Sequence, residues 1–152
     1  MLKNLFEMER AEELKERVLR LTPESPRLWG KMNAAQAVAH CALALDFASG
    51  DLNLGRAGLG TRIVGRLVKP FVFKDDAPIR RNVPTIPGLV VCDERDLAAE
   101  SERLLMAIDR FAGAGPAGCT TCPHFFFGRL TPAEWAILMY KHVDHHLRQF
   151  GA

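Results

Sequence analysis

The chain has 152 residues, of which 48% are hydrophobic and 25% are charged, as is typical of a single globular domain. Its 20 Lys and Arg against 18 Asp and Glu leave a net charge of +2, which is too small to indicate a nucleic-acid partner or an anionic membrane surface. The N-terminal segment lacks a signal-peptide core and no apolar run reaches membrane-spanning length, so we expect one domain over residues 1–152, located in the cytoplasm.

The first third of the chain predicts two amphipathic helices. Over residues 2–21, apolar side chains recur at helical spacing among Glu, Lys and Arg. After a proline-containing connector, Asn33 and Gln36 have the spacing of a capping box, which predicts a second helix that runs to about Ser49. His40 lies in the middle of this second helix on its apolar face, so we expect its imidazole to point into the core.

The middle of the chain predicts little regular structure. Residues 61–73 predict a short helix broken at Pro70, because an internal proline removes a backbone hydrogen bond. The next segment, residues 74–92, carries three prolines and predicts an irregular crossover. Arg80 and Arg81 lie in this crossover, where two roles stay open: a clamp for an anionic substrate, or part of a solvated loop.

The last third of the chain predicts two more helices. Asp93 begins a segment with apolar residues at helical spacing, which ends at the run GAGPAG. The final helix starts with Thr131 at the N-cap, Pro132 next and Glu134 at the third position, and it should run to about Phe150. Four long amphipathic helices without strand patterns or internal repeats predict an all-α, up-and-down four-helix bundle, with a long crossover between the second and third long helices.

Three histidines predict a metal site. His142 and His146 lie one turn apart on the last helix, so their imidazoles can bind one ion, with His40 on the second helix as the third ligand. Hydrogen-bonded core histidines are the alternative, but three inward imidazoles each need a partner and one divalent ion satisfies all three. We expect one transition-metal ion, zinc or nickel first, with iron and manganese as further candidates. Three protein ligands leave coordination positions open, as in catalytic sites.

Three other side chains are candidates for supporting roles. Gln36 lies one turn before His40 and Gln149 follows His146 by three residues, so their amides could orient the ligands or bound water. The alternative makes them polar residues at the end of the bundle. His124 precedes the last helix, where it could act catalytically as a proton shuttle or as a fourth ligand; alternatively it is a loop histidine bonded to the backbone.

A separate zinc site is a competing interpretation of the loop before the last helix. Cys119 and Cys122 form a single CxxC pair, and His124 follows it closely. Such a zinc knuckle needs a fourth ligand, and the neighbouring sequence does not supply one.

The segments WGKMNAAQAVAHC (29–41) and PHFFFGRLTPAEWAILMYKHVDHHLRQFG (123–151) resemble the DinB-like, or YfiT-like, four-helix metal proteins, in which one early histidine joins an HxxxH pair on a late helix. The resemblance covers nearly the whole chain and is to a branch without an assigned reaction. It implies that the three histidines are the metal ligands, and Gln149 matches a glutamine that commonly follows the last one. Around His124 the relatives carry a PHPFFG-like turn, and this chain has Phe125 in place of that proline.

Two functions follow as hypotheses. Characterised members of that superfamily include enzymes that transfer groups onto low-molecular-weight thiols such as bacillithiol or mycothiol, and hydrolase-like proteins. The resemblance therefore implies a metal-dependent transferase or hydrolase that activates a thiol or water for a small-molecule substrate. The rival is a non-catalytic metal-binding or stress-associated ligand-binding bundle. We expect neither a nucleic-acid nor a membrane partner, and a homodimer is compatible with a bundle of this size.

Overall fold

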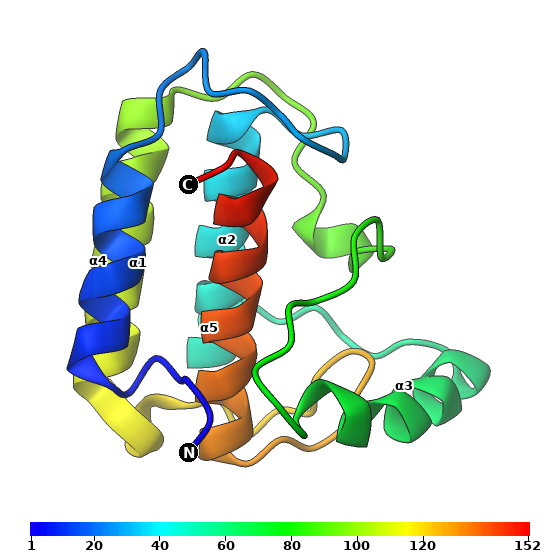
Figure 1. Cartoon of the computed structure of the whole chain (residues 1–152). Helices are drawn as coiled ribbons and strands as arrows, with labels where there is room; N and C mark the ends of the chain where they lie inside the picture. The colour runs from blue at the N-terminus through cyan, green and yellow to red at the C-terminus, as the bar shows by residue number, and fades with distance from the viewer.

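Figure 1 shows a computed structural model of the chain, which describes residues 1–152 and is all-helical. It contains no β-strand, and no helix in it is both long enough and apolar enough to span a membrane. The α-helices are α1 (Met8–Leu19), α2 (Ala34–Ser49), α3 (Leu59–Val72), α4 (Leu97–Ala114) and α5 (Pro132–Gln149), and two short 3-10 turns are η1 (Pro87–Leu89) and η2 (Gly115–Gly118).

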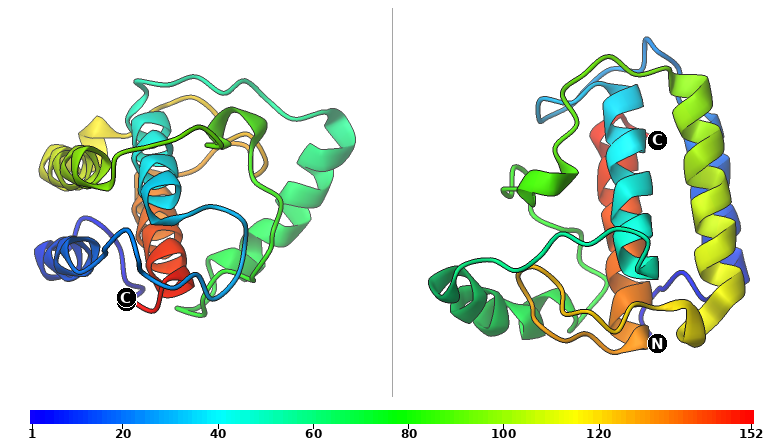
Figure 2. Two further views of the ribbon diagram at one scale, coloured as in Figure 1. Left: turned by 90° about the horizontal axis from the view of Figure 1, so that it is seen from above. Right: turned by 180° about the vertical axis from the view of Figure 1, so that it is seen from behind.

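Four of the helices run side by side, and α3 projects from one end of the molecule (Figures 1 and 2). Helix α2 packs against α4 and α5, and α1 packs against the same two helices. Large side chains that are almost fully buried fill the space between them: Leu5, Leu14, Leu45, Leu104, Ile108, Phe111 and Trp135. Burying one such side chain typically stabilises a fold by about 1.5–3 kcal/mol, so this core holds the four helices together.

Helix α2 is buried on most of its surface because it is rich in alanine. Twelve of its 16 residues are buried, and small side chains allow α4 and α5 to approach its backbone closely. Its ends follow the sequence prediction: Asn33 and Gln36 form the capping box, and Gly50 ends the helix with φ 86°, in the left-handed region. This placement carries His40 into the interior of the protein.

The capping box at the start of α5 is also confirmed. The Thr131 side chain accepts from the backbone N–H of Glu134, and the Glu134 carboxylate accepts from the backbone N–H of Thr131. Because Pro132 occupies the first helical position, the helix starts one residue after Thr131 and continues to Gln149, close to the predicted end.

Three predicted helix boundaries were wrong. Helix α1 begins at Met8 rather than near residue 2, because Asn4 accepts from the N–H of Phe6 in a local turn that competes with the helix. Helix α4 begins at Leu97 rather than Asp93, since the Asp96 side chain caps the helix. Helix α3 begins before residue 61 and continues through Pro70.

The crossover between α2 and α4 covers the face where α2 and α5 meet. After α3, the chain runs along α5, where the buried Lys141 ammonium donates to the carbonyls of Val72 (2.8 Å), Asp75 (2.5 Å) and Ala77 (3.2 Å). It then reaches α2 at η1, where the Leu89 carbonyl meets His40. The crossover is therefore irregular, as predicted, but it is fixed by hydrogen bonds to both helices.

Candidate metal centre

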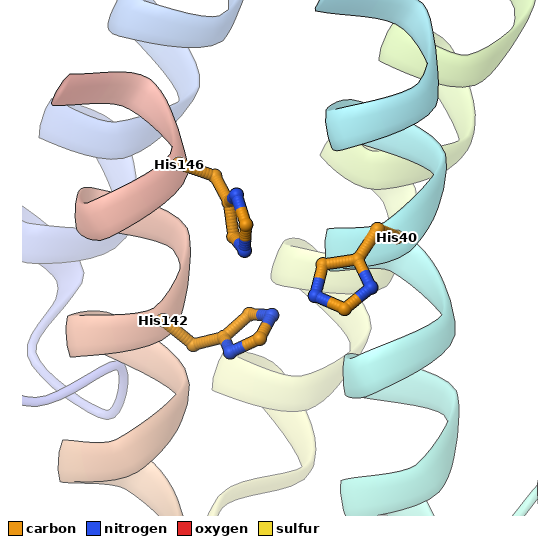
Figure 3. Close-up of side chains that lie close together, drawn as sticks. All are labelled: His40, His142 and His146. Atoms are coloured by element: carbon orange, nitrogen blue, oxygen red, sulfur yellow. The ribbon is translucent and has the colours of Figure 1, made fainter. Parts of the chain in front are cut away.

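His40, His142 and His146 converge in the space between α2 and α5. Figure 3 shows the three imidazoles turned toward one another, with one nitrogen of each directed at a shared point. One ring nitrogen from each residue lies within 4.8 Å of the other two. The ring centroids are 4.8 Å apart for His40 and His142, 4.7 Å for His40 and His146, and 4.9 Å for His142 and His146. The structure thus brings together the three residues that the sequence predicts as ligands.

The tautomer of His40 is set by the crossover. Its Nδ1 lies 2.7 Å from the carbonyl oxygen of Leu89. Because a carbonyl oxygen only accepts, Nδ1 carries the proton and Nε2 keeps its lone pair. Burial lowers the pKa of His40, so the ring is neutral at physiological pH. His40 therefore presents a lone pair at Nε2 to the shared space, as a metal ligand does.

A similar contact sets the tautomer of His146. The amide of Gln149 donates through Nε2 to the carbonyl of Trp29 (2.7 Å), which directs its Oε1 to Nδ1 of His146 (3.0 Å). Since Oε1 is an acceptor, Nδ1 of His146 carries the proton and Nε2 keeps the lone pair. Burial, reinforced by the neighbouring His40, lowers the pKa of His146 to about 3. Gln149 thus orients one candidate ligand from behind, as its sequence position predicts.

His142 carries a buried polar atom that no protein group satisfies. Its Nε2 has no hydrogen-bond partner, and burial together with His40 and His146 lowers its pKa well below the ordinary value. An unsatisfied buried nitrogen of this kind typically costs about 1–3 kcal/mol. A divalent ion between the three rings would accept lone pairs from all three, so the donor set fits a transition-metal ion.

Family membership rests on the sequence comparison. A sequence model of the family DUF1569, described as a protein of unknown function, matches residues 3–152. The chain belongs to the DUF1569 family. Comparisons with curated proteins and with solved structures found no match. The family description assigns no activity to this DUF1569 protein.

Gln36 does not orient the triad, contrary to the prediction. Its Oε1 accepts from the backbone N–H of Asn33 (3.0 Å), and its Nε2 donates to the carbonyl of Asp93 (3.0 Å). Both ends of the amide are therefore used to cap α2 and to fasten the segment before α4. The capping interaction, which is local in sequence, takes the side chain away from His40.

His124 holds a turn together. Its Nδ1 accepts from the backbone N–H groups of Phe126 (3.1 Å) and Phe127 (3.3 Å), so the proton of the neutral ring is on Nε2. The ring stacks on Phe127 and packs against Trp135 and Phe47, and burial lowers its pKa to about 4. The converging ligand atoms belong to the triad alone, so His124 is not a fourth ligand. These contacts fit the alternative of a backbone-bonded loop histidine.

The competing zinc knuckle is not formed. Cys119 is partly buried and Cys122 is exposed, and both are free thiols. The triad is the single group of three or more candidate ligand atoms that come together in this structure. His124 faces the turn that follows it, so it is not available to complete a site with the two cysteines.

Two further features lie beside the triad. The first is the pair of backbone carbonyls of Leu89 and Trp29, which fix the orientation of the ligands. Every residue has a backbone carbonyl, so the residue types of a sequence cannot reveal such a contact. His145 is the second feature: its Nδ1 faces the carbonyl of Ile79 (3.2 Å), and its ring lies edge-on to His146 at 5.1 Å. It therefore lies at the rim of the candidate metal centre and outside the ligand set.

Proposed function

We propose that this DUF1569 protein binds one divalent transition-metal ion through Nε2 of His40, His142 and His146. The observation that supports the proposal is the pair of fixed tautomers. His40 and His146 each donate through Nδ1 to an acceptor, so their Nε2 lone pairs face each other and the partnerless Nε2 of His142. The facing lone pairs of His40 and His146 repel each other, and a bound cation relieves that repulsion. Zinc and nickel are the first candidates and iron and manganese follow.

We also propose that α1, α2, α4 and α5 form a four-helix bundle of the DinB-like kind. The side-by-side packing of these helices supports it, as does the division of the ligands between α2 and α5. In this arrangement facing helices project side chains into a shared site, which is the usual way in which bundles hold metals. The crossover along α5 and α2 then serves as a cover for one side of the site.

For the activity, we propose a metal-dependent transferase or hydrolase acting on a small molecule. The chemistry that an ion with open coordination positions supplies is Lewis-acid activation of a thiol or a water. The chain's own contribution is to hold three neutral imidazoles in place through Leu89, Gln149 and Trp29. His142 and His146 remain partly exposed while His40 is buried, so a small molecule would approach from the α5 side.

One observation favours a second candidate, a non-catalytic metal-binding protein. His124, the residue predicted to move a proton, has its Nδ1 engaged by two backbone N–H groups and is neutral. Thermal unfolding of His146→Ala separates the two candidates. A structural ion predicts a large loss of stability, whereas a catalytic ion predicts a modest loss together with lost turnover.

Calorimetric titration with Zn²⁺ and Ni²⁺ tests the metal proposal. The wild-type protein should bind one equivalent, and His142→Ala should bind none with comparable affinity. His145→Ala is the matched control, because it removes a neighbouring imidazole that faces Ile79 rather than the triad. Equal binding by wild type and His142→Ala would refute the site, and so would loss of binding in the control alone.

A further inference from the structure

A cavity of about 250 Å³ lies beside the C-terminal half of α5, between the connector that follows α1 and the crossover. Its walls combine apolar groups with cationic and aromatic ones. Leu28, Pro78 and Ile79 supply the apolar part, and Trp29, Arg81, His145 and Arg148 supply the rest. No acidic residue lines it. The volume lies just below the usual range of about 300–1,000 Å³ for small-molecule sites, which suits a small ligand.

The guanidinium of Arg81 is held in position without a carboxylate partner. Although the residue is exposed, the guanidinium lies 4.0 Å from the centroid of the Trp29 ring, a cation–π contact that favours this position over the ring. Arg148, by contrast, is paired through Nε with Asp144 (2.7 Å), which leaves its terminal nitrogens free. Arg81 takes part in no ion pair of the protein, so its hydrogen-bond donors remain available to an anion.

The cavity shares a wall with the candidate metal centre. The ring of His145 lies 5.8 Å from that of Trp29 on one side and 5.1 Å from that of His146 on the other. The backbone carbonyl of Trp29 accepts the Gln149 amide, which in turn contacts His146. A ligand held over Trp29 would therefore lie one side chain away from the triad.

We propose that this cavity binds a small organic anion with an apolar or aromatic portion, and that such anions are the substrate class of the metal centre. The acidic group pairs with Arg81, which can contact a carboxylate or phosphate through two parallel hydrogen bonds. The apolar portion packs against Trp29 and Ile79. As a statement about a substrate, the proposal rests on the proposed function; as a statement about a binding site, it stands on the cavity alone.

Tryptophan fluorescence of the full-length protein tests the binding site. Trp29 is partly exposed at the cavity, whereas Trp135 is fully buried in the core, so Trp29→Phe identifies the signal that comes from the cavity. The probes are benzoate and phenyl phosphate, with neutral benzamide as the matched ligand. Both anions should change the emission saturably, and their relative affinities show which acidic group is preferred. Arg81→Gln should weaken anion binding about 10- to 100-fold, as expected for loss of a charge-assisted contact.

Arg80→Gln is the matched control, because Arg80 is exposed like its neighbour Arg81 but does not line the cavity. It should bind both anions as the wild type does. Benzamide binding as tightly as benzoate would overturn the proposal, and so would equal affinities in Arg81→Gln and Arg80→Gln.

Repeating the titration with metal-free His142→Ala distinguishes failure of this proposal from failure of the metal site. Anion binding that survives in His142→Ala but is lost in Arg81→Gln supports the cavity, whatever the outcome of the metal titration. Anion binding that requires His142 and added zinc but is indifferent to Arg81→Gln overturns the cavity and leaves the metal proposal standing.

Discussion

Replacing Gln149 by Leu should weaken metal binding about 10- to 100-fold, the usual effect of removing a group that orients a ligand from behind. In the wild type, the Gln149 amide connects Nδ1 of His146 (3.0 Å) to the carbonyl of Trp29 (2.7 Å). The side chain is 3% exposed, so water cannot easily replace either contact. Leucine leaves both partners without a hydrogen bond and frees the His146 ring to rotate and to change tautomer.

The same substitution should reduce the free energy of unfolding by about 1–3 kcal/mol for each buried group that loses its partner. Gln149→Glu separates the two effects, because a carboxylate still accepts from Nδ1 of His146 but cannot donate to Trp29. We expect Gln149→Glu to lose stability and to keep most of its zinc affinity. Gln36→Leu is the control of the same residue type, since Gln36 caps α2 and does not contact the triad.

The assay is competition for Zn²⁺ against a chromogenic chelator, with denaturant unfolding of the metal-free proteins in parallel. We expect lower zinc affinity in Gln149→Leu and unchanged affinity in Gln36→Leu, even though both variants are destabilised. Wild-type affinity in Gln149→Leu would refute the role given to this amide. Equal loss of affinity in the two variants would show that stability, rather than ligand orientation, controls metal binding.

Three further predictions concern the surroundings of the site. Burial lowers the pKa of His124 from 6.5 to about 4, so the unfolded chain binds this proton at a higher pH than the folded protein does. His124 should therefore contribute a loss of about 3 kcal/mol in the free energy of unfolding as the pH falls from about 6.5 to 4. His124→Asn keeps an acceptor for the turn, so its unfolding free energy should fall less over this range; an identical pH dependence would contradict the assignment. Lys141→Met should lower the free energy of unfolding, measured with denaturant, by about 1–3 kcal/mol because three crossover carbonyls lose their donor. Lys74 is exposed, so Lys74→Met should leave stability nearly unchanged, and equal effects of the two substitutions would be inconsistent with a fixed crossover. Gly65→Ala should destabilise the protein by about 1–3 kcal/mol because the added Cβ collides with the backbone of Phe126. Gly60 lies in the same helix, and a Cβ added there meets open space, so Gly60→Ala should stabilise the protein by about 0.5–1 kcal/mol. The opposite ranking of the two variants in thermal unfolding would exclude this packing of α3.

Features that depend on local sequence could be predicted. The capping boxes at Asn33 and Thr131 require only residues three positions apart, and both are present. The HxxxH spacing on α5 likewise places His142 and His146 on one face through helix geometry alone. Helical periodicity places all three histidines on inward faces, and buried imidazoles need partners. These two facts together predicted that His40 lies close to His142 and His146.

Features that depend on distant backbone groups could not be predicted. The carbonyl that sets the His40 tautomer belongs to Leu89, 49 residues away in an irregular segment. Gln36 and Gln149 have similar sequence positions relative to a histidine, yet only Gln149 contacts the triad, because the capping box engages Gln36. The cavity over Trp29 could not be predicted for a similar reason, since its walls come from two connectors and from α5, which only the folded chain brings together.

A bound ion is central to the proposed function, so the decisive measurement is elemental analysis of protein purified without a histidine tag, beside His40→Ala and His142→Ala. We expect close to one equivalent of a transition metal in the wild type and loss of that metal in both variants. A wild-type protein that contains no metal, even after zinc, nickel, manganese or iron is added, would contradict metal binding by the triad.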